Sequence, residues 1–374
     1  MLVAWRMLMH EKGRSALAIC GIVVALLLIF LQLGFYFAVP RGGMLIYDTI
    51  RFDIVLASPD YAYQAQSGTI PRRRLYQALA LPDVREALPF YQATGEWMAA
   101  SSGTARDVFI MAFDPAQRIF DVEDIEAGRS QLRRPDTILV DTATRREFGE
   151  LTSDRIVEIE RRAEMIAGTY RLGTGFVGLG AAITSDQNFV RIFANRSLAD
   201  VSLGLLRLAP GADARVVAAR LREIMPADTA VMTRAELTNH EVRYWTTRTS
   251  TGLVFGFGAA IAFVVGMVIV NQILSTQILR QLPQYATLKA IGYTNGDLRQ
   301  IIVSLAALMA IIAYLPSVIL ATGIYAVLRR ATLLPVDMTS TRLLAVLLIA
   351  LTMSAISALA STRILQRADP VDLF

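Results

Sequence analysis

Four long runs without Asp, Glu, Lys or Arg constrain the fold of this chain more than any other feature of its sequence. A helix needs roughly 20 mostly apolar residues to cross the hydrocarbon core of a bilayer, and each run meets that length. We therefore expect a membrane protein with four transmembrane helices. The predicted transmembrane helices cover residues 16–39, 249–279, 300–328 and 343–362.

The first apolar run could also belong to a cleaved signal peptide, because Lys12 and Arg14 precede it. The apolar core of a signal peptide is usually about 7 to 15 residues long. The run from Ala16 to Ala38 is much longer. We therefore expect a helix that is retained in the mature protein.

Basic residues around these runs predict the orientation of the chain, since short segments rich in Lys and Arg tend to stay in the cytoplasm. With four crossings, eight of them fall on one side and three, Arg329, Arg330 and Arg342, fall on the other. Both termini are then cytoplasmic. The predicted cytoplasmic segments are an amphipathic lead-in over 1–15, a loop over 280–299 and a tail over 363–374. The predicted extracytoplasmic segments are 40–248 and a short loop over 329–342.

The segment over 40–248, between the first and second helices, is large enough to be a folded domain. Short runs rich in β-branched and large apolar residues alternate in it with helical stretches, which predicts an α+β fold. The clearest unit reads as strand, helix and strand over 201–232. In its helix four apolar residues are expected on one face, namely Val216, Val217, Leu221 and Ile224. Further strands are predicted over 52–57, 108–113, 137–140 and 155–160, and a further helix over 72–80.

Several kinds of chemistry are not expected in this chain. It contains no G-x-x-x-x-G-K-[ST] motif, so ATP hydrolysis by that route needs a partner subunit. Ion-coupled carriers usually hold an ionisable residue near the middle of the membrane, and the four runs contain no Asp, Glu, His, Lys or Arg. One cysteine and two histidines in separate regions do not suit a zinc site. We expect no catalytic, cofactor-binding or metal-binding residues here, and no nucleic-acid partner.

A few polar or helix-bending residues stand out within the predicted spans. Gln32, Asn271 and Gln272 carry side chains that can hydrogen-bond between helices. Asn271 and Gln272 lie near the predicted cytoplasmic end, so contact with lipid headgroups is an equally good interpretation. Pro316 either kinks the third helix or is a tolerated structural proline.

The loop after the second predicted span contains a pattern typical of a short helix. Gln284 to Ile291 form the predicted helix, with Pro283 in the first turn and Gly292 as its stop. Thr294, Asn295 and Asp297 then offer caps for the next helix. Three apolar residues recur at helical spacing, namely Tyr285, Leu288 and Ile291. Such a stripe indicates either a docking surface for a cytosolic partner or an interfacial anchor.

The stretch ATLKAIGYTNGDLRQ over 286–300 resembles the signature of FtsX/MacB-type ABC transporter permeases, where it follows the second transmembrane helix and contacts the ATPase. Residues 4–15 and 368–372 are similar to the lead-in and the C-terminal tail of the same permeases. Residues 170–193 resemble the DevC-like branch specifically. The resemblance implies that the ATPase-coupling residues are Pro283, Tyr285, Leu288, Lys289, Ile291, Gly292 and Tyr293.

The resemblance also implies a function and a set of partners. Such permeases pair as dimers with two copies of a separate ATPase, which binds ATP and Mg. DevC-like members work in the bacterial inner membrane with a periplasmic adaptor, or membrane fusion protein, and an outer-membrane channel. They export glycolipids or other envelope molecules, and the family mechanism is mechanotransmission. The alternative is an FtsX-like regulator that transports nothing and switches an extracytoplasmic cell-wall hydrolase.

Overall fold

The computed structural model describes residues 12–98, 103–173, 178–332 and 335–366. They form two compact units. The helical unit holds the described residues up to Ala38 and nearly all of those from Ser250 onward, and the inserted domain is Val39–Thr249. Most of the predicted lead-in, residues 1–11, and the end of the predicted tail, residues 367–374, lie outside the described residues.

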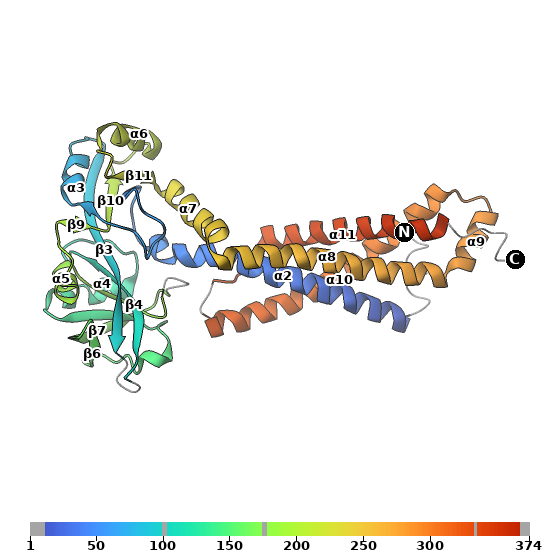
Figure 1. Cartoon of the computed structure of the whole chain (residues 1–374), viewed down its shortest axis with the longest axis horizontal. Coiled ribbons are helices and arrows are strands. Elements are labelled where there is room, and N and C mark those ends of the chain that lie inside the picture. Colours follow the sequence, from blue (N-terminus) through green and yellow to red (C-terminus); the bar gives the residue numbers. More distant parts are fainter. Residues whose placement is uncertain (1–11, 99–102, 174–177, 333–334, 367–374) are drawn as a thin grey trace. The chain divides into compact units, whose positions relative to one another are not determined.

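Four helices of the described chain are long and apolar enough to cross a membrane, as predicted. In the helical unit they run side by side (Figure 1). A short fifth helix joins the second and third. The helices are α2 (Lys12–Thr49), α8 (Ser250–Arg280), α9 (Leu282–Ala290), α10 (Asn295–Thr332) and α11 (Ser340–Gln366).

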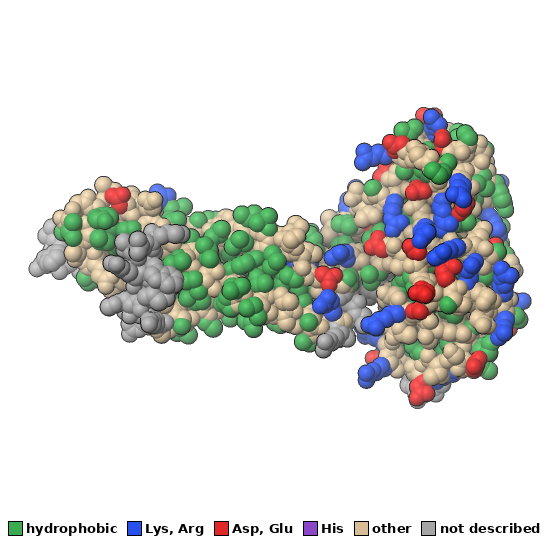
Figure 2. Space-filling model, turned by 180° about the vertical axis from the view of Figure 1, so that it is seen from behind, with side chains coloured by type: hydrophobic (Ala, Val, Ile, Leu, Met, Phe, Trp, Pro, Cys, Tyr) green, Lys and Arg blue, Asp and Glu red, His purple; other side chains and the backbone are tan. Residues whose placement is uncertain are grey.

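Close approach and hydrogen bonds between helices hold this unit together. A Cβ atom at Gly34 of α2 would lie 2.5 Å from the hydroxyl of Tyr325 on α10, so only glycine fits there. The Tyr325 hydroxyl donates to the carbonyl of Phe30. On the face seen in Figure 2, apolar side chains are spread along the length of the unit. Such a surface suits contact with lipid.

The first helix is longer than the predicted span. It continues through Pro40 to Thr49, and its last residues belong to the inserted domain. Proline lacks the N–H that would bond four residues back, but helices tolerate this where neighbouring groups compensate. The proline and the charge of Arg41 therefore end the apolar run without ending the helix.

The inserted domain is built on a mixed sheet of nine strands in the order β11-β1-β10-β3-β4-β8-β5-β7-β6, with a separate pair β2-β9. The α+β expectation is confirmed. The strands are β1 (Ile54–Ala57), β2 (Ile70–Pro71), β3 (Val84–Met98), β4 (Ala105–Phe113), β5 (Thr137–Asp141), β6 (Ile156–Ile159), β7 (Arg162–Tyr170), β8 (Ala181–Ser185), β9 (Asp200–Val201), β10 (Leu203–Leu208) and β11 (Ala230–Thr233). The helices are α3 (Arg73–Ala78), α4 (Glu123–Gly128), α5 (Asp186–Ile192), α6 (Ala214–Ile224) and α7 (Arg234–Arg243), with η1 (Gln131–Arg133), η2 (Arg146–Phe148) and η3 (Tyr244–Arg248).

One half of the sheet has the split βαβ arrangement of ferredoxin-like folds. Its strand order is β11-β1-β10-β3, all antiparallel, and the helices α3 and α6 are the two crossovers. Strand β10 inserts between β1 and β3, so that Leu205 pairs with both Val55 and Leu88. The predicted strand, helix and strand over 201–232 is the second crossover of this half.

The other half of the sheet closes on itself. The far end of β3 pairs with β4 and also with β6, where Trp97 lies opposite Ile159. The strands β3, β4, β8, β5, β7 and β6 therefore form a ring. Two neighbouring pairs, β4 with β8 and β5 with β7, are parallel. The long strand β3 thus belongs to both halves and joins them.

The predicted buried face of helix α6 is partly wrong. Val217 and Leu221 are buried, as expected, but Val216 and Ile224 are 48% and 49% exposed. Ala218 completes the buried stripe instead. An alanine contributes little to the apolar pattern of a sequence. The larger residues Val216 and Ile224 therefore dominate the pattern, and the predicted buried face is rotated by part of a turn from the observed one.

Candidate coupling site

The segment between α8 and α10 is an ordered helix and turn. Helix α9 begins at Leu282 with Pro283 in its first turn and ends at Ala290, close to the predicted bounds. Its end is closed by Gly292, whose φ of +106° suits glycine. The N–H of Gly292 donates to the carbonyl of Lys289, and the N–H of Tyr293 to that of Leu288, at 3.0 and 3.1 Å. These two bonds form a Schellman motif, which rigidifies the turn.

A cap then starts helix α10, as the sequence predicts. The hydroxyl of Thr294 accepts from the N–H of Asp297 at 3.2 Å, and a carboxylate oxygen of Asp297 accepts from the N–H of Thr294 at 2.9 Å. This is a reciprocal capping pair. The hydrogen bonds from Thr294 also hold the pKa of Asp297 below its usual range. The segment therefore has both of its turns fixed by local hydrogen bonds.

The three apolar residues of the predicted stripe do not share one exposed face. Tyr285 is 2% exposed and packs among helices of the bundle, and Leu288 is half-buried against the same core. Ile291 is 72% exposed and Tyr293 is 42% exposed. The correction follows from helix geometry, since at 3.6 residues per turn Ile291 is rotated by about 120° from the direction of Tyr285, six residues earlier. The exposed apolar pair at this site is Ile291 and Tyr293.

The polar residues predicted within the spans differ in their surroundings. The side-chain oxygen of Asn271 on α8 accepts from the hydroxyl of Ser361 on α11 at 2.9 Å, so Asn271 does bond between helices. Gln272 is exposed and points away from that contact. Gln32 of α2 lies against Gly258 of α8, and its side-chain oxygen is buried without a hydrogen-bond partner.

Pro316 lies inside α10. It cannot donate to the carbonyl four residues back. The next residue, Ser317, is buried, and its hydroxyl donates to the carbonyl of Ala313 at 2.7 Å and to that of Val23 on α2 at 3.4 Å. The proline is therefore accommodated in a continuous helix that packs on α2.

Two of the three arginines that oppose the charge bias are partnered locally. Arg329 forms an ion pair with Asp337 at 2.9 Å. Arg342 lies in α11 and not in the loop, and it is 4% exposed. Its guanidinium lies 5.5 Å from the ring centroid of Tyr325 and 5.9 Å from that of Phe37. It also donates to the carbonyl of Asp337. The loop between α10 and α11 is thus less basic than its sequence suggests.

Sequence reasoning missed a buried carboxyl group in the inserted domain. Glu241 of α7 is fully buried, and it accepts hydrogen bonds from the hydroxyl of Tyr61 and from the indole N–H of Trp245 at 3.1 Å. Tyr61 in turn lies 2.8 Å from the hydroxyl of Tyr47 on α2. Burial raises the pKa of Glu241 to about 7. No sequence pattern links residues so far apart along the chain.

The same region ties the end of α2 to α7. A Cβ atom at Gly43 of α2 would lie 2.5 Å from the indole nitrogen of Trp245, so the backbone of α2 passes directly against that ring. Arg234, at the start of α7, donates to the carbonyls of Tyr47 and Ile50 at 2.9 and 2.8 Å. We call these contacts, together with the hydrogen bonds of Glu241, the α2–α7 clasp.

The described residues contain no group of three or more His, Cys, Asp or Glu side chains that could hold a metal ion.

The described chain thus holds an ordered helix and turn between two apolar helices, together with an inserted α+β domain. Residues 256–370 match the family described as FtsX-like permease C-terminal, and this range contains the whole of the α9 segment. The match covers less than half of the chain, and over this range the sequence is similar to FtsX-like permeases.

Two solved structures are similar to part of the chain. One is the periplasmic region of MacB from Actinobacillus actinomycetemcomitans, with 7% identity, a TM-score of 0.37, and coverage of 52% of this chain and 94% of that one. The other is the extracellular domain of the noncanonic ABC-type transporter YknZ from Gram-positive bacteria, with 11% identity, a TM-score of 0.33, and coverage of 48% and 98%. No curated protein matches this chain.

Proposed function

We propose that this chain is the membrane subunit of an ABC exporter and that a separate ATPase drives it through the α9 segment. The observation that carries the proposal is the exposed apolar pair Ile291 and Tyr293 on a turn fixed by hydrogen bonds, within the matched family region. A rigid turn with exposed apolar side chains transmits force from a bound partner better than a flexible loop does. ATP and Mg belong to that partner.

Mechanotransmission is the mechanism that fits the way the membrane helices continue into the inserted domain. Helix α2 runs without a break to Thr49, and α8 is preceded by the π-helical turn η3 and by α7. Within the inserted domain the α2–α7 clasp joins these two elements. Motion of α2 and α8 at their cytoplasmic ends would therefore reach the inserted domain through two linked elements.

The wider assembly follows from the same proposal. The permease pairs with a second copy and with two copies of the ATPase, in the inner membrane, with both termini cytoplasmic and the inserted domain periplasmic. The excess of basic residues on the predicted cytoplasmic side, eight against three, supports this orientation. An adaptor and an outer-membrane channel would carry an envelope lipid or another amphiphile onward.

The test is affinity purification of the tagged full chain in mild detergent, with mass spectrometry of the captured proteins. The double variant Ile291→Asp, Tyr293→Asp places two charges on the exposed pair. The matched control is Ile156→Asp, which changes an isoleucine of the inserted domain that is 69% exposed. We expect the wild type and the control to recover an ATPase and the double variant to lose it.

The captured proteins also separate the two candidate functions. Recovery of an adaptor together with the ATPase supports export. Recovery of a cell-wall hydrolase with the ATPase supports the regulator instead. If the double variant recovers as much ATPase as the wild type, the α9 turn has no coupling role. If no form of the chain recovers an ATPase, both functions are contradicted.

A further inference from the structure

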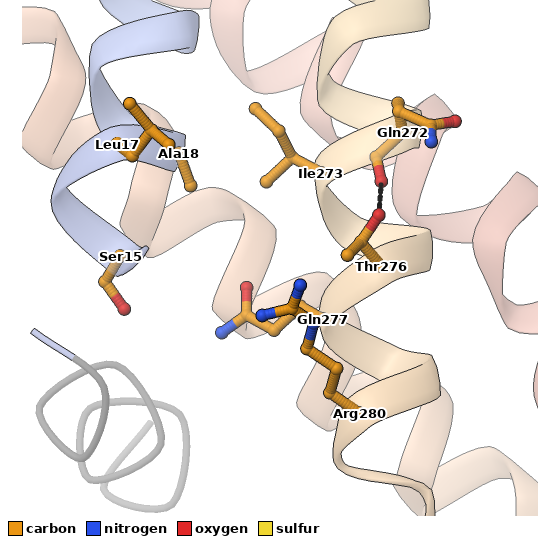
Figure 3. Close-up of a pocket in the computed structure, with 8 residues that line it drawn as sticks. All are labelled: Ser15, Leu17, Ala18, Gln272, Ile273, Thr276, Gln277 and Arg280. Atoms are coloured by element: carbon orange, nitrogen blue, oxygen red, sulfur yellow. Dashed lines mark hydrogen bonds between the residues drawn. The ribbon is translucent and has the colours of Figure 1, made fainter. Parts of the chain in front are cut away.

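A groove of about 410 Å³ lies between the start of α2 and the end of α8 (Figure 3). Leu17 and Ala18 of α2 face Ile273 of α8 across it, while Gln277 and Arg280 extend from α8 into the open space. The residues that line it are Ser15, Leu17, Ala18, Gln272, Ile273, Thr276, Gln277 and Arg280. The α2 side of the groove is thus mainly apolar, and the α8 side is mainly polar.

The groove is closed toward the middle of the bundle by the contact of α2 with α8. A Cβ atom at Gly21 would lie 3.4 Å from the side chain of Ile273 and 3.5 Å from that of Ile269. A ligand that enters the groove therefore cannot pass between the helices. Its remaining length must lie along their outer surface, where Val24 of α2 and Val268 of α8 are exposed apolar residues.

The polar wall offers hydrogen-bond donors and one positive charge. Arg280 is exposed and forms no ion pair with any described residue. The hydroxyl of Thr276 donates to the carbonyl of Gln272 at 2.8 Å. The donors aimed into the open space are the guanidinium of Arg280 and the side-chain amide of Gln277 (Figure 3). No carboxylate is among the described residues that line the groove. Such a wall suits an anion that only accepts hydrogen bonds.

The position of the groove along the helices indicates which anion this is. Arg280 is the first charged residue after the long uncharged stretch of α8, and Lys12 and Arg14 are the last before the uncharged run of α2. These charges mark the level at which the hydrocarbon core gives way to lipid headgroups. The anion present at that level in every membrane is the phosphodiester of a phospholipid.

We propose that the groove between α2 and α8 binds the headgroup of an anionic phospholipid, with Arg280 and Gln277 on its phosphate and an acyl chain along the exposed apolar side chains of α2 and α8. The site is distinct from the α9 turn and is independent of the proposed coupling to an ATPase. A lipid held there would fix the spacing of the two helices that continue into the inserted domain.

Native mass spectrometry of the full chain, titrated with dioleoyl phosphatidylglycerol, tests this proposal. Arg280→Gln removes the charge, and Ala18→Trp fills the groove while leaving the charge in place. Arg299→Gln is the matched control, because Arg299 is an exposed arginine at the same end of the helical unit. We expect both groove variants to lower the occupancy of phosphatidylglycerol about tenfold and the control to leave it within about twofold. Dioleoyl phosphatidylcholine, which has no net charge, should bind more weakly.

Each alternative occupant has its own result. Equal binding to the wild type and both groove variants, or an equal loss in Arg299→Gln, would overturn the specific site. Displacement of phosphatidylglycerol by excess inorganic phosphate would show that free phosphate is the ligand. Binding that appears only after deletion of residues 1–11 would assign the groove to the lead-in of the chain. If the groove variants lose the mass of the dimer but still bind phosphatidylglycerol, the groove is assigned to contact with a second copy of the chain.

Discussion

At the scale of single residues, the most consequential group is the carboxyl of Glu241. It is fully buried, and it accepts hydrogen bonds from Tyr61 and Trp245. The neighbouring ring of His240 contacts Tyr61, and its Nε2 lies 3.0 Å from the carbonyl of Ala62. Burial without an opposite charge disfavours the ionised form. The protonation state of Glu241 is therefore part of the α2–α7 clasp.

We predict that Glu241 makes the inserted domain less stable as the pH rises from about 5 to 8. Its pKa is raised from 4.5 to about 7 in the folded state, so in this window the folded chain binds a proton that the unfolded chain has lost. The stabilisation is complete below about pH 4.5 and is lost as the pH passes about 7, with a difference of up to about 3 kcal/mol. Thermal unfolding of the purified protein across this range measures the slope.

The matched variant for this prediction is Glu241→Gln, which keeps the size of the side chain and cannot ionise. We expect a smaller fall in Tm with rising pH than in the wild type. Glu164 of β7 is also fully buried, and burial raises its pKa to about 7, so Glu164→Gln should remove a second, separate part of the slope. A wild-type slope that persists in the double variant would contradict the assignment to these two groups.

Residue-level features were the least predictable from the sequence. The caps Thr294 and Asp297 are neighbours along the chain, and local spacing predicted them correctly. Glu241 and its partner Tyr61 are far apart along the chain, and only the fold brings them into contact. Helix α7 also shows little apolar periodicity, so nothing in its sequence marked one acid as buried.

At the scale of elements, α9 is a helix whose bounds were predicted more accurately than its orientation. Its beginning and end follow from Pro283 and Gly292, which act locally. The orientation of its inner face depends on which helices it contacts. A stripe of apolar residues is compatible both with packing on another protein and with packing on the same chain. Tyr285 in fact anchors α9 in the hydrophobic core of the helical unit.

We predict that Tyr285→Ala detaches α9 from the bundle. The ring is buried, so its removal should cost about 3 kcal/mol of local stability. The hydroxyl is buried without a hydrogen-bond partner, and Tyr285→Phe should therefore be neutral or slightly stabilising. Hydrogen exchange of Leu282–Ala290 measures both, with Ser340–Gln366 as the internal reference. Slow exchange in both variants would show that other contacts hold α9.

At the scale of the whole molecule, the chain contains separate hydrophobic cores. One core joins α2, α8, α10 and α11, whereas two others lie within the inserted domain on the two sides of its sheet. The sequence predicted this division, because the charge-free runs stop where the mixed pattern begins. The strand order was not predictable, since it depends on pairings between distant segments.

We predict that residues 39–249 fold when produced alone as a soluble fragment. The fragment keeps both of its cores and the α2–α7 clasp, which holds its two ends together. It should show cooperative thermal unfolding and the far-UV circular dichroism of a mixed α+β protein. A fragment starting at residue 50 lacks Gly43 and Tyr47 and should unfold at lower temperature. Equal Tm values for the two fragments would show that the α2–α7 clasp does not stabilise the domain.

The place of β10 in the sheet has a consequence for the biosynthesis of this protein. Ile54 of β1 pairs with Leu206 of β10, roughly 150 residues later. Until β10 has been synthesised, β1 and β3 each present an unpaired edge to the surroundings. In the orientation proposed above, the ferredoxin-like half can close only when most of the inserted domain has been translocated, and until then the chain depends on whatever protects exposed strand edges in that compartment.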